Sequence, residues 1–174
     1  NSSDLFDWRP SQKAQTLDDA RELFIDHLDK GTECPCCGRY TKRYKRKLNC
    51  GMAWMIIQIY QKCCRSESMV LHVADCFLAE KKNAVAQEYS KLRFWGLLFP
   101  VESDDPKVQR EQPGSGFWRL TPEGVAFVTG RTTIPKHVFL VNGKREGFSD
   151  ERVTIRQCLG NKFDYDELMA PSNF

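Results

Sequence analysis

Hydrophobic residues recur every three to four positions in several stretches of this chain. The densest stretch is residues 51–64, where methionine, isoleucine and aromatic residues fill one wide face. This pattern predicts a largely buried core helix that begins after Asn49. Residues 17–30 follow the same period with acidic residues opposite, and predict a surface helix that begins after Thr16.

The stretch 84–130 combines several local signals in a fixed order. Its first part has helical spacing over residues 84–95, and Gly96 follows where a left-handed helix end favours glycine. Two short apolar runs, 97–99 and 117–120, predict strands on either side of a polar loop. Thr121, followed by Pro122, then predicts the start of another helix.

The residues just upstream extend this order. Residues 69–72 predict a short strand, 73–80 a helix, and 81–83 the turn that leads to the helix at 84–95. The series of helix, strand, helix, helix, strand, loop and strand resembles a winged helix-turn-helix domain, which implies that 84–95 is a recognition helix. The residues that carry the resemblance are Leu92, Gly96, Leu97, Leu98, Trp118, Leu120, Thr121 and Gly124.

The C-terminal part has a different pattern. Asn142 and Gly143 separate two runs, 137–141 and 144–148, and predict a β-hairpin with a type I′ turn. Residues 154–159 predict a short helix. The acidic segment 163–169 carries apolar anchors, and it either docks on the domain or serves as a peptide for another protein.

These elements predict an α+β fold that is mainly helical, with a winged-helix core, an N-terminal helix and a C-terminal hairpin appendage. The predicted division has three parts. They are an N-terminal helix with a Cys-rich basic segment, the winged-helix domain, and the hairpin with an acidic tail, at residues 1–47, 48–130 and 131–174.

Composition narrows the class of protein. Of the 174 residues, 41% are hydrophobic and 28% are charged, which is typical of a folded globular chain. No apolar run approaches the roughly 18 residues needed to cross a bilayer. The polar beginning lacks a signal-peptide pattern, so we expect a cytoplasmic protein that does not bind membranes. No phosphate loop, nucleophile elbow or zinc-protease motif occurs, so we expect no enzymatic activity.

Eight cysteines point to thiols or a metal site rather than disulfides in such a compartment. The run Cys34-Pro35-Cys36-Cys37-Gly38 resembles a zinc knuckle, in which Cys34 and Cys37 would supply two ligands. A structural zinc needs four ligands, and His72 and Cys76 are possible further ones. The alternative is a set of free cysteines without metal.

The segment 39–47 is the densest basic stretch, because six of its nine residues are Lys or Arg and two are Tyr. Basic side chains bind phosphates, and tyrosines stack on bases. The alternative is a solvated surface, or one neutralised by the acidic helix at 17–30. The predicted phosphate-binding residues are Arg39, Lys42, Arg43, Lys45, Arg46 and Lys47.

The helix at 84–95 is the predicted base-reading element. Its polar side carries Gln87, Ser90, Lys91 and Arg93, which can bind base edges or phosphates. The loop 103–116 has a net charge of −1, however, whereas a wing that follows phosphates is normally positive. A winged helix that binds a protein would show this acidic loop as well.

Four segments together resemble small uncharacterised proteins of bacteriophages and prophages. They are the cysteine turn, Lys47-Leu48-Asn49, the segment from Tyr89 to Leu98 and the terminal Phe163–Met169 segment. The resemblance implies no established activity, but it favours a phage-encoded regulator, or an effector that binds a host protein, in the host-cell cytoplasm. The sequence thus predicts a non-enzymatic, regulatory protein that binds double-stranded DNA. The alternative is a protein-binding module that inhibits or redirects a host protein such as a nucleic-acid enzyme.

Overall fold

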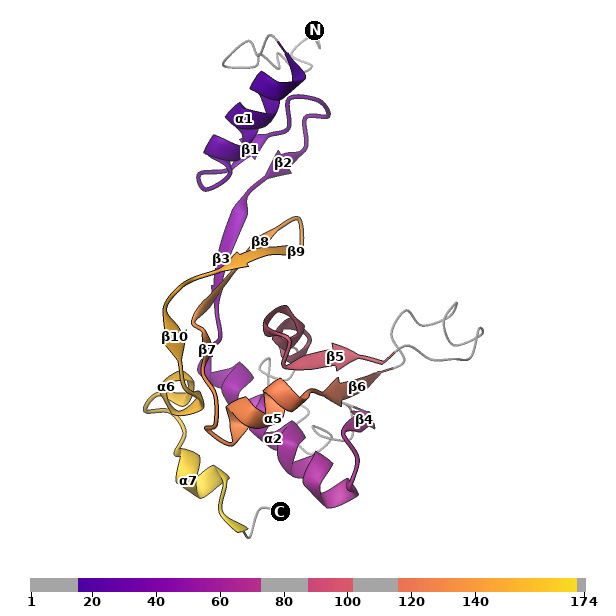
Figure 1. The fold of residues 1–174 in the computed structure, drawn as a ribbon, viewed down its shortest axis with the longest axis vertical. Helices are drawn as coiled ribbons and strands as arrows, with labels where there is room; N and C mark the ends of the chain where they lie inside the picture. Colours follow the sequence, from indigo (N-terminus) through magenta and orange to yellow (C-terminus); the bar gives the residue numbers. More distant parts are fainter. Residues whose placement is uncertain (1–15, 73–87, 102–115, 172–174) are drawn as a thin grey trace, which may run out of the picture. The chain divides into compact units, whose positions relative to one another are not determined.

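The structure is a computed structural model, and it describes residues 16–72, 88–101 and 116–171 (Figure 1). The contacts divide these residues into two compact units. The described part of unit 1 lies within Asn1–Lys45 and Phe139–Glu146, and that of unit 2 lies within Arg46–Val138 and Gly147–Phe174. Each unit is described by itself below.

Unit 1 begins with the predicted surface helix, α1 (Leu17–His27). The Thr16 hydroxyl accepts a hydrogen bond from the Asp19 amide at 3.1 Å, and the Thr16 amide donates to the Asp19 carboxylate at 3.0 Å. This reciprocal capping box satisfies two amides that the first turn leaves free. A hairpin follows, in which β1 (Thr32–Glu33) pairs antiparallel with β2 (Tyr40–Thr41).

A second sheet has the strand order β3–β8–β9, from β3 (Arg43–Lys47), β8 (His137–Val141) and β9 (Lys144–Phe148). Asn142 and Gly143 connect β8 to β9 with φ of 49° and 74°. A type I′ turn needs two positive φ angles, which explains the Asn-Gly pair. The predicted hairpin is therefore confirmed with its predicted boundaries.

Unit 2 is organised around α2 (Cys50–Ser66), the predicted core helix. Asn49 caps it, because its side-chain oxygen accepts from the Met52 amide at 2.9 Å. The helix is buried on most of its surface, as its apolar pattern predicts. Its buried residues are Gly51, Met52, Ala53, Met55, Ile56, Ile57, Ile59, Gln61 and Cys63.

A three-stranded antiparallel sheet in unit 2 has the order β4–β6–β5, from β4 (Val70–His72), β6 (Phe117–Leu120) and β5 (Leu98–Pro100). Arg119 of β6 pairs with Val70 of β4 on one side and with Phe99 of β5 on the other, so β6 is the central strand. The three strands predicted at 69–72, 97–99 and 117–120 are confirmed, with their boundaries shifted by a residue in two of them.

The segment before β5 is a 3₁₀-helix, η3 (Tyr89–Trp95), where the spacing predicted an α-helix over 84–95. A 3₁₀-helix has three residues per turn, so Tyr89, Leu92 and Trp95 lie on one side, and the latter two are buried. Gly96 ends it with φ of 76°, as expected for a left-handed end. The expected helix at 73–80, the turn at 81–83 and residues 84–87 lie outside the described residues.

After the sheet, Thr121 caps α5 (Pro122–Val128) through the Gly124 amide at 2.9 Å. The rest of unit 2 contains β7 (Ile134–Pro135), which pairs with β10 (Arg152–Val153), and α6 (Ile155–Leu159), the predicted short helix.

The acidic C-terminal segment forms α7 (Tyr165–Leu168) and docks on unit 2. The Tyr165 hydroxyl donates to the Val128 carbonyl at 2.9 Å, and the Gln61 amide group donates to the Leu168 carbonyl. Phe163 stacks on Trp54, with 6.1 Å between the ring centroids. Of the two predicted roles for this segment, docking is the one observed.

The predicted fold class is wrong. The described residues hold six helices and ten strands, and they are 41% helical and 26% strand, so the protein is α+β with several small sheets rather than mainly helical. The strands that the sequence did not predict are four pieces of two residues, which hydrophobic periodicity cannot detect, and β3, whose five residues are mostly charged. Within the described residues, no helix has the length and apolar character needed to cross a membrane.

Candidate nucleic-acid interface

Unit 1 separates its charges between its helix and its strands. Residues 16–30, which hold α1, carry five Asp or Glu against two Lys or Arg. The strands and turns at 32–45 and 139–146 carry six Lys or Arg against two Glu. A net charge of +4 on these two short segments creates a local positive potential that the chain's total of +3 does not reveal.

Arg43, one of the predicted phosphate-binding residues, forms ion pairs with two acidic side chains. Its Nε lies 2.6 Å from one oxygen of Glu146 and its Nη2 lies 3.1 Å from the other, while Nη1 lies 2.9 Å from Asp29. These bonds raise the pKa of Arg43 and lower that of Glu146. Arg43 therefore ties β3 to β9 and to the end of the helical region within unit 1.

Three other cations of this segment have no acidic partner among the described residues. Arg39 and Lys45 are exposed, Lys42 is half-buried, and none of the three forms an ion pair with a described residue. Arg43 reaches Glu146 on one face of the sheet, and the two-residue alternation of strands places Lys45 and Lys144 on that same face. Lys144 is exposed on β9, as is its neighbour Arg145.

Two tyrosines lie among these cations. Tyr40 on β2 is 56% exposed and Tyr44 on β3 is 54% exposed. Tyr40 packs over Gly31, whose φ of 93° and missing side chain leave room for the phenol ring. More than half of each tyrosine surface is thus open to solvent beside Lys and Arg, which is the composition of nucleic-acid-binding surfaces.

In unit 2, Arg46 and Lys47 continue the basic run and are exposed. Lys91, a predicted base-reading residue, forms an ion pair with Glu88, which also accepts a 2.6 Å hydrogen bond from Asn49. Both bonds lower the pKa of Glu88. Lys91 is therefore bound within the fold and is the weaker candidate for contact with a base.

The remaining residues of the predicted reading helix differ in their placement. Arg93 is exposed and lies over the Phe94 ring, 5.1 Å from its centroid. Ser90 is half-buried on η3, and Gln87 lies outside the described residues. Arg39, Lys42 and Lys45 thus lie in one segment of unit 1, whereas Arg93 is the exposed cation among the predicted reading residues of η3.

The cysteine turn lies between β1 and β2 and has a defined backbone. The Cys34 amide donates to Arg39 O at 2.9 Å, and the Gly38 amide donates to Cys34 O at 2.8 Å. Backbone amides of Cys36 and Cys37 and the Cys37 thiol hydrogen-bond the Cys34 sulfur and lower its pKa. The turn therefore favours a thiolate, which is the form that binds a metal.

The cysteine turn fits half of a zinc site. Cys34 and Cys37 can supply two thiolate ligands, but in the described parts of the chain no three His, Cys, Asp or Glu side chains are grouped to hold a metal ion. His72 lies on β4 in unit 2 against the Phe117 ring, and Cys76 is outside the described residues. Zinc at Cys34 and Cys37 stays a prediction.

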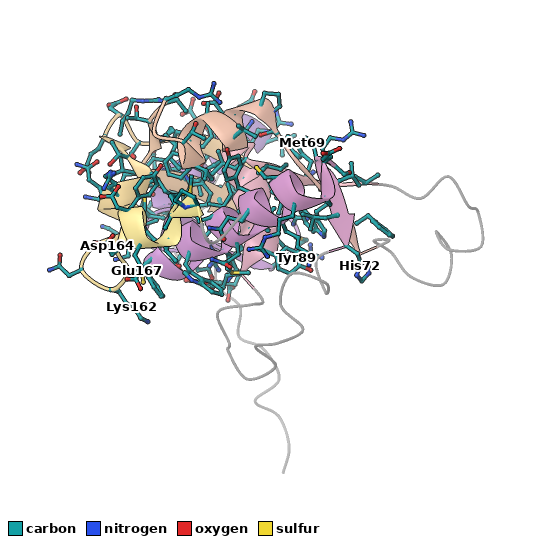
Figure 2. All side chains as sticks on the ribbon, turned by 90° about the horizontal axis from the view of Figure 1, so that it is seen from below. Met69, His72, Tyr89, Lys162, Asp164 and Glu167 are labelled. Carbon is teal, nitrogen blue, oxygen red and sulfur yellow. The ribbon has the colours of Figure 1, made fainter. Side chains whose placement is uncertain are left out.

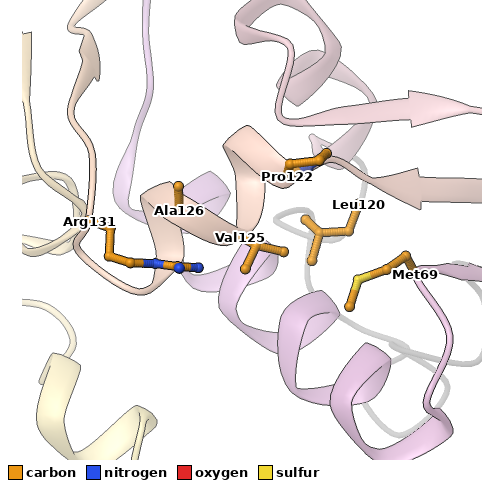
Figure 3. A pocket seen from close by; sticks show the side chains of 6 residues that line it. All are labelled: Met69, Leu120, Pro122, Val125, Ala126 and Arg131. Carbon is orange, nitrogen blue, oxygen red and sulfur yellow. The ribbon is translucent and has the colours of Figure 1, made fainter.

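A separate hollow in unit 2 has a volume of about 430 Å³. Met69 and Arg131 lie toward its two ends, and the other lining residues are apolar (Figure 3). The Arg131 Nε donates to the Thr129 hydroxyl at 2.9 Å. Among the described residues of this lining, Arg131 is the one ionisable group, so they offer no pair of acid and base.

Sequence reasoning missed two groups of residues. Lys144 and Arg145 are far along the chain from 39–47, yet the order β3–β8–β9 places both segments in one sheet. The hairpin signal at Asn142-Gly143 could have placed them on an exposed strand, but not in the same sheet as β3. The exposed phenylalanines Phe99 and Phe117 were assigned only to strands.

Comparison with protein-family models, with curated proteins and with solved structures finds no match to this chain.

Proposed function

We propose that this protein binds nucleic acid without catalysing a reaction, and that the basic strands of unit 1 grip the phosphates of duplex DNA. One observation carries the proposal. Arg39, Lys42 and Lys45 form no ion pair with described residues, and they lie in the same segment as Tyr40 and Tyr44, which are more than half exposed.

The charge separation in unit 1 supports the same function. A phosphate backbone attracts a concentrated group of cations and is repelled by acidic groups, so it would meet the strands and avoid α1. Each Lys or Arg that neutralises a phosphate releases condensed counterions, and the affinity then falls steeply with salt. Lys144 and Arg145 add to the same sheet from β9.

The test is the salt dependence of binding to a labelled duplex of about 20 base pairs, followed by fluorescence anisotropy. Lys45→Gln and Arg39→Gln should each weaken binding about three- to tenfold at ~50 mM salt, and each should reduce the salt slope by about one. Lys30→Gln removes the same charge from a position just beyond the C-terminal end of α1 and should change affinity less than about twofold.

Two results would contradict this function. The first is the absence of duplex binding at ~50 mM salt, where phosphate contacts are strongest. The second is an equal loss of affinity in Lys30→Gln and Lys45→Gln, because the net charge and not the position of the cation would then control binding.

A second candidate function, binding to another protein, is favoured by the surface of α1. Leu17 and Ile25 are both 57% exposed on this acidic helix. Replacing both with Ser should leave DNA affinity unchanged and should abolish a protein contact made through α1. Retention of a partner protein by the double variant would exclude this surface.

A further inference from the structure

The sheet β4–β6–β5 in unit 2 has one buried face and one exposed face. Along β6 the side chains alternate: Phe117 and Arg119 are exposed, whereas Trp118 and Leu120 are buried. The buried face is completed by apolar residues of the outer strands, and Tyr89 of η3 contacts Trp118 edge to face at 5.2 Å. One face of the sheet therefore packs into the core of unit 2, and the other face is exposed.

The exposed face carries aromatic and basic side chains in adjacent rows. Phe99 lies directly opposite Arg119 in the register, and the Val101 amide donates to Phe117 O at 2.9 Å, which extends the pairing by one step. Phe99 and Phe117 are thus diagonal neighbours on adjacent strands, a relation in which long side chains lie within ~7–8 Å. Their exposed fractions are 49% and 45%.

His72 completes this face at the end of β4 (Figure 2). It pairs with Phe117 in the register, and its ring meets the Phe117 ring edge to face at 5.0 Å. This contact holds one edge of the Phe117 ring and leaves nearly half of the side chain exposed. Gly116 precedes Phe117 and has a φ of 72°. A side chain at Gly116 would collide with the His72 ring.

The size of the face limits what it can bind. The three strands have three, four and three residues, so only about six side chains point outward. A standard protein–protein interface takes roughly 20–30 residues from each partner. The face is too small for a stable protein dimer, but it matches the two or three bases that stack on the aromatic residues of a small sheet.

We propose that the outer face of β4–β6–β5 binds unpaired nucleotides, with Phe99 and Phe117 stacking on successive bases and Arg119 binding the phosphate between them. Aromatic rings accept any base, and the Arg119 guanidinium, which neighbours both phenylalanines in the register, neutralises the phosphate that links the two bases. The inference rests on the proposed nucleic-acid binding of the chain. It adds that the bound nucleic acid includes a single-stranded part.

The test measures binding of the full chain to a labelled oligo-dT of about 12 nucleotides and, separately, to the 20-base-pair duplex. Phe99→Ala and Phe117→Ala should each weaken oligo-dT binding about tenfold. Phe117→Tyr should retain it, because the ring is kept. Duplex affinity should change less than about twofold in all three. The matched control is Phe148→Ala, which removes an exposed phenylalanine of β9 and should leave the oligo-dT affinity unchanged.

Three outcomes would overturn the inference. One is unchanged oligo-dT binding in Phe99→Ala and Phe117→Ala, and another is an equal loss in Phe148→Ala. The third is a dimer of the native chain in sedimentation velocity that Phe117→Ala dissociates, since the face would then join two copies. Loss of duplex binding in the native chain would instead contradict the proposed function, so the two failures are distinguishable.

Discussion

Arg43 and Glu146 form a two-point ion pair between strands that are 103 residues apart in the sequence. The pair joins the two outer strands of the sheet β3–β8–β9, so it removes one cation from the basic strands of unit 1. The side chain of Arg43 is 23% exposed and that of Glu146 is 42% exposed. Screening by solvent limits the contribution of such a pair to folding to about 1 kcal/mol or less.

Glu146→Gln is therefore expected to raise the affinity for duplex DNA. The neutral side chain no longer holds the guanidinium as strongly, so Arg43 becomes able to contact a phosphate. We expect about a threefold gain at ~50 mM salt and a salt slope that is steeper by about one. Anisotropy titrations of both proteins at several salt concentrations measure the two quantities.

The control for this change is Glu33→Gln. Glu33 is an exposed residue of β1 in the same unit, and it forms no ion pair with the described residues. Its substitution changes the net charge by the same amount without releasing an arginine. A gain of equal size in both variants would show that only the net charge matters.

Glu88 should make the stability of unit 2 sensitive to acid. Its hydrogen bonds from Lys91 and Asn49 lower its pKa below the ordinary 4.5, so the stabilisation is present above the unfolded pKa and is lost as pH falls through the folded pKa. Glu88→Gln should lower the free energy of unfolding by about 1 kcal/mol at pH 7. This difference should shrink below pH ~4.

Urea unfolding between pH 7 and pH 3, followed by tryptophan fluorescence, measures this effect. Asp150→Asn provides the comparison, because Asp150 is exposed and forms no ion pair with any residue in the described ranges. A difference between Glu88→Gln and the native chain that stays constant with pH would exclude a titrating role for Glu88.

Cys34 and Cys158 should differ strongly in reactivity. Hydrogen bonds from Cys36 and Cys37 lower the pKa of Cys34, whereas burial raises that of Cys158 to about 11. The thiolate is the reactive form, so at pH 8 iodoacetamide should modify Cys34 at least about tenfold faster. Peptide mapping by mass spectrometry gives both rates.

The pH dependence of these rates separates the effect of thiol ionisation from the effect of reagent access to a buried thiol. The rate for Cys34 should level off at a lower pH than the rate for Cys158, which should still rise toward pH 11. If zinc binds at Cys34 and Cys37, added zinc ions should slow modification of these two thiols and leave Cys158 unaffected. Equal rates for Cys34 and Cys158 at pH 8 would contradict the thiolate at Cys34.

The parts of the fold that could be predicted are those that neighbouring residues determine. The apolar period of residues 51–64 predicted α2, and Asn142-Gly143 predicted the β8–β9 hairpin, because a helix face and a tight turn are local properties. The 3₁₀ form of η3 was not predicted. The spacing of Tyr89, Leu92 and Trp95 fits both kinds of helix.

The parts that could not be predicted depend on long-range pairing. β1, β2, β7 and β10 have two residues each, so no alternation marks them in the sequence. Neutralisation by the helix at 17–30 was one alternative to phosphate binding by the basic segment, and Asp29 does supply one contact to Arg43. The stronger partner, Glu146, comes from a strand that only the folded sheet brings near.

Gly124 should be required for the packing of α5 against the start of β5. It is buried, and a Cβ at this position would overlap the backbone carbonyl of Leu97. A carbonyl cannot rotate away as a side chain can, and the Thr121 amide also donates to it at 3.2 Å. Gly124→Ala should therefore lower the free energy of unfolding by about 1–3 kcal/mol, as measured by urea unfolding.

Gly147→Ala is the matched control for the Gly124 substitution. Nothing lies within 4 Å of the place that a methyl group would occupy at Gly147, and its φ is not left-handed. We expect that control to change the free energy of unfolding by less than about 0.5 kcal/mol. Equal stability of the two variants would mean that α5 moves to accept the methyl group, and that Gly124 is not required at this contact.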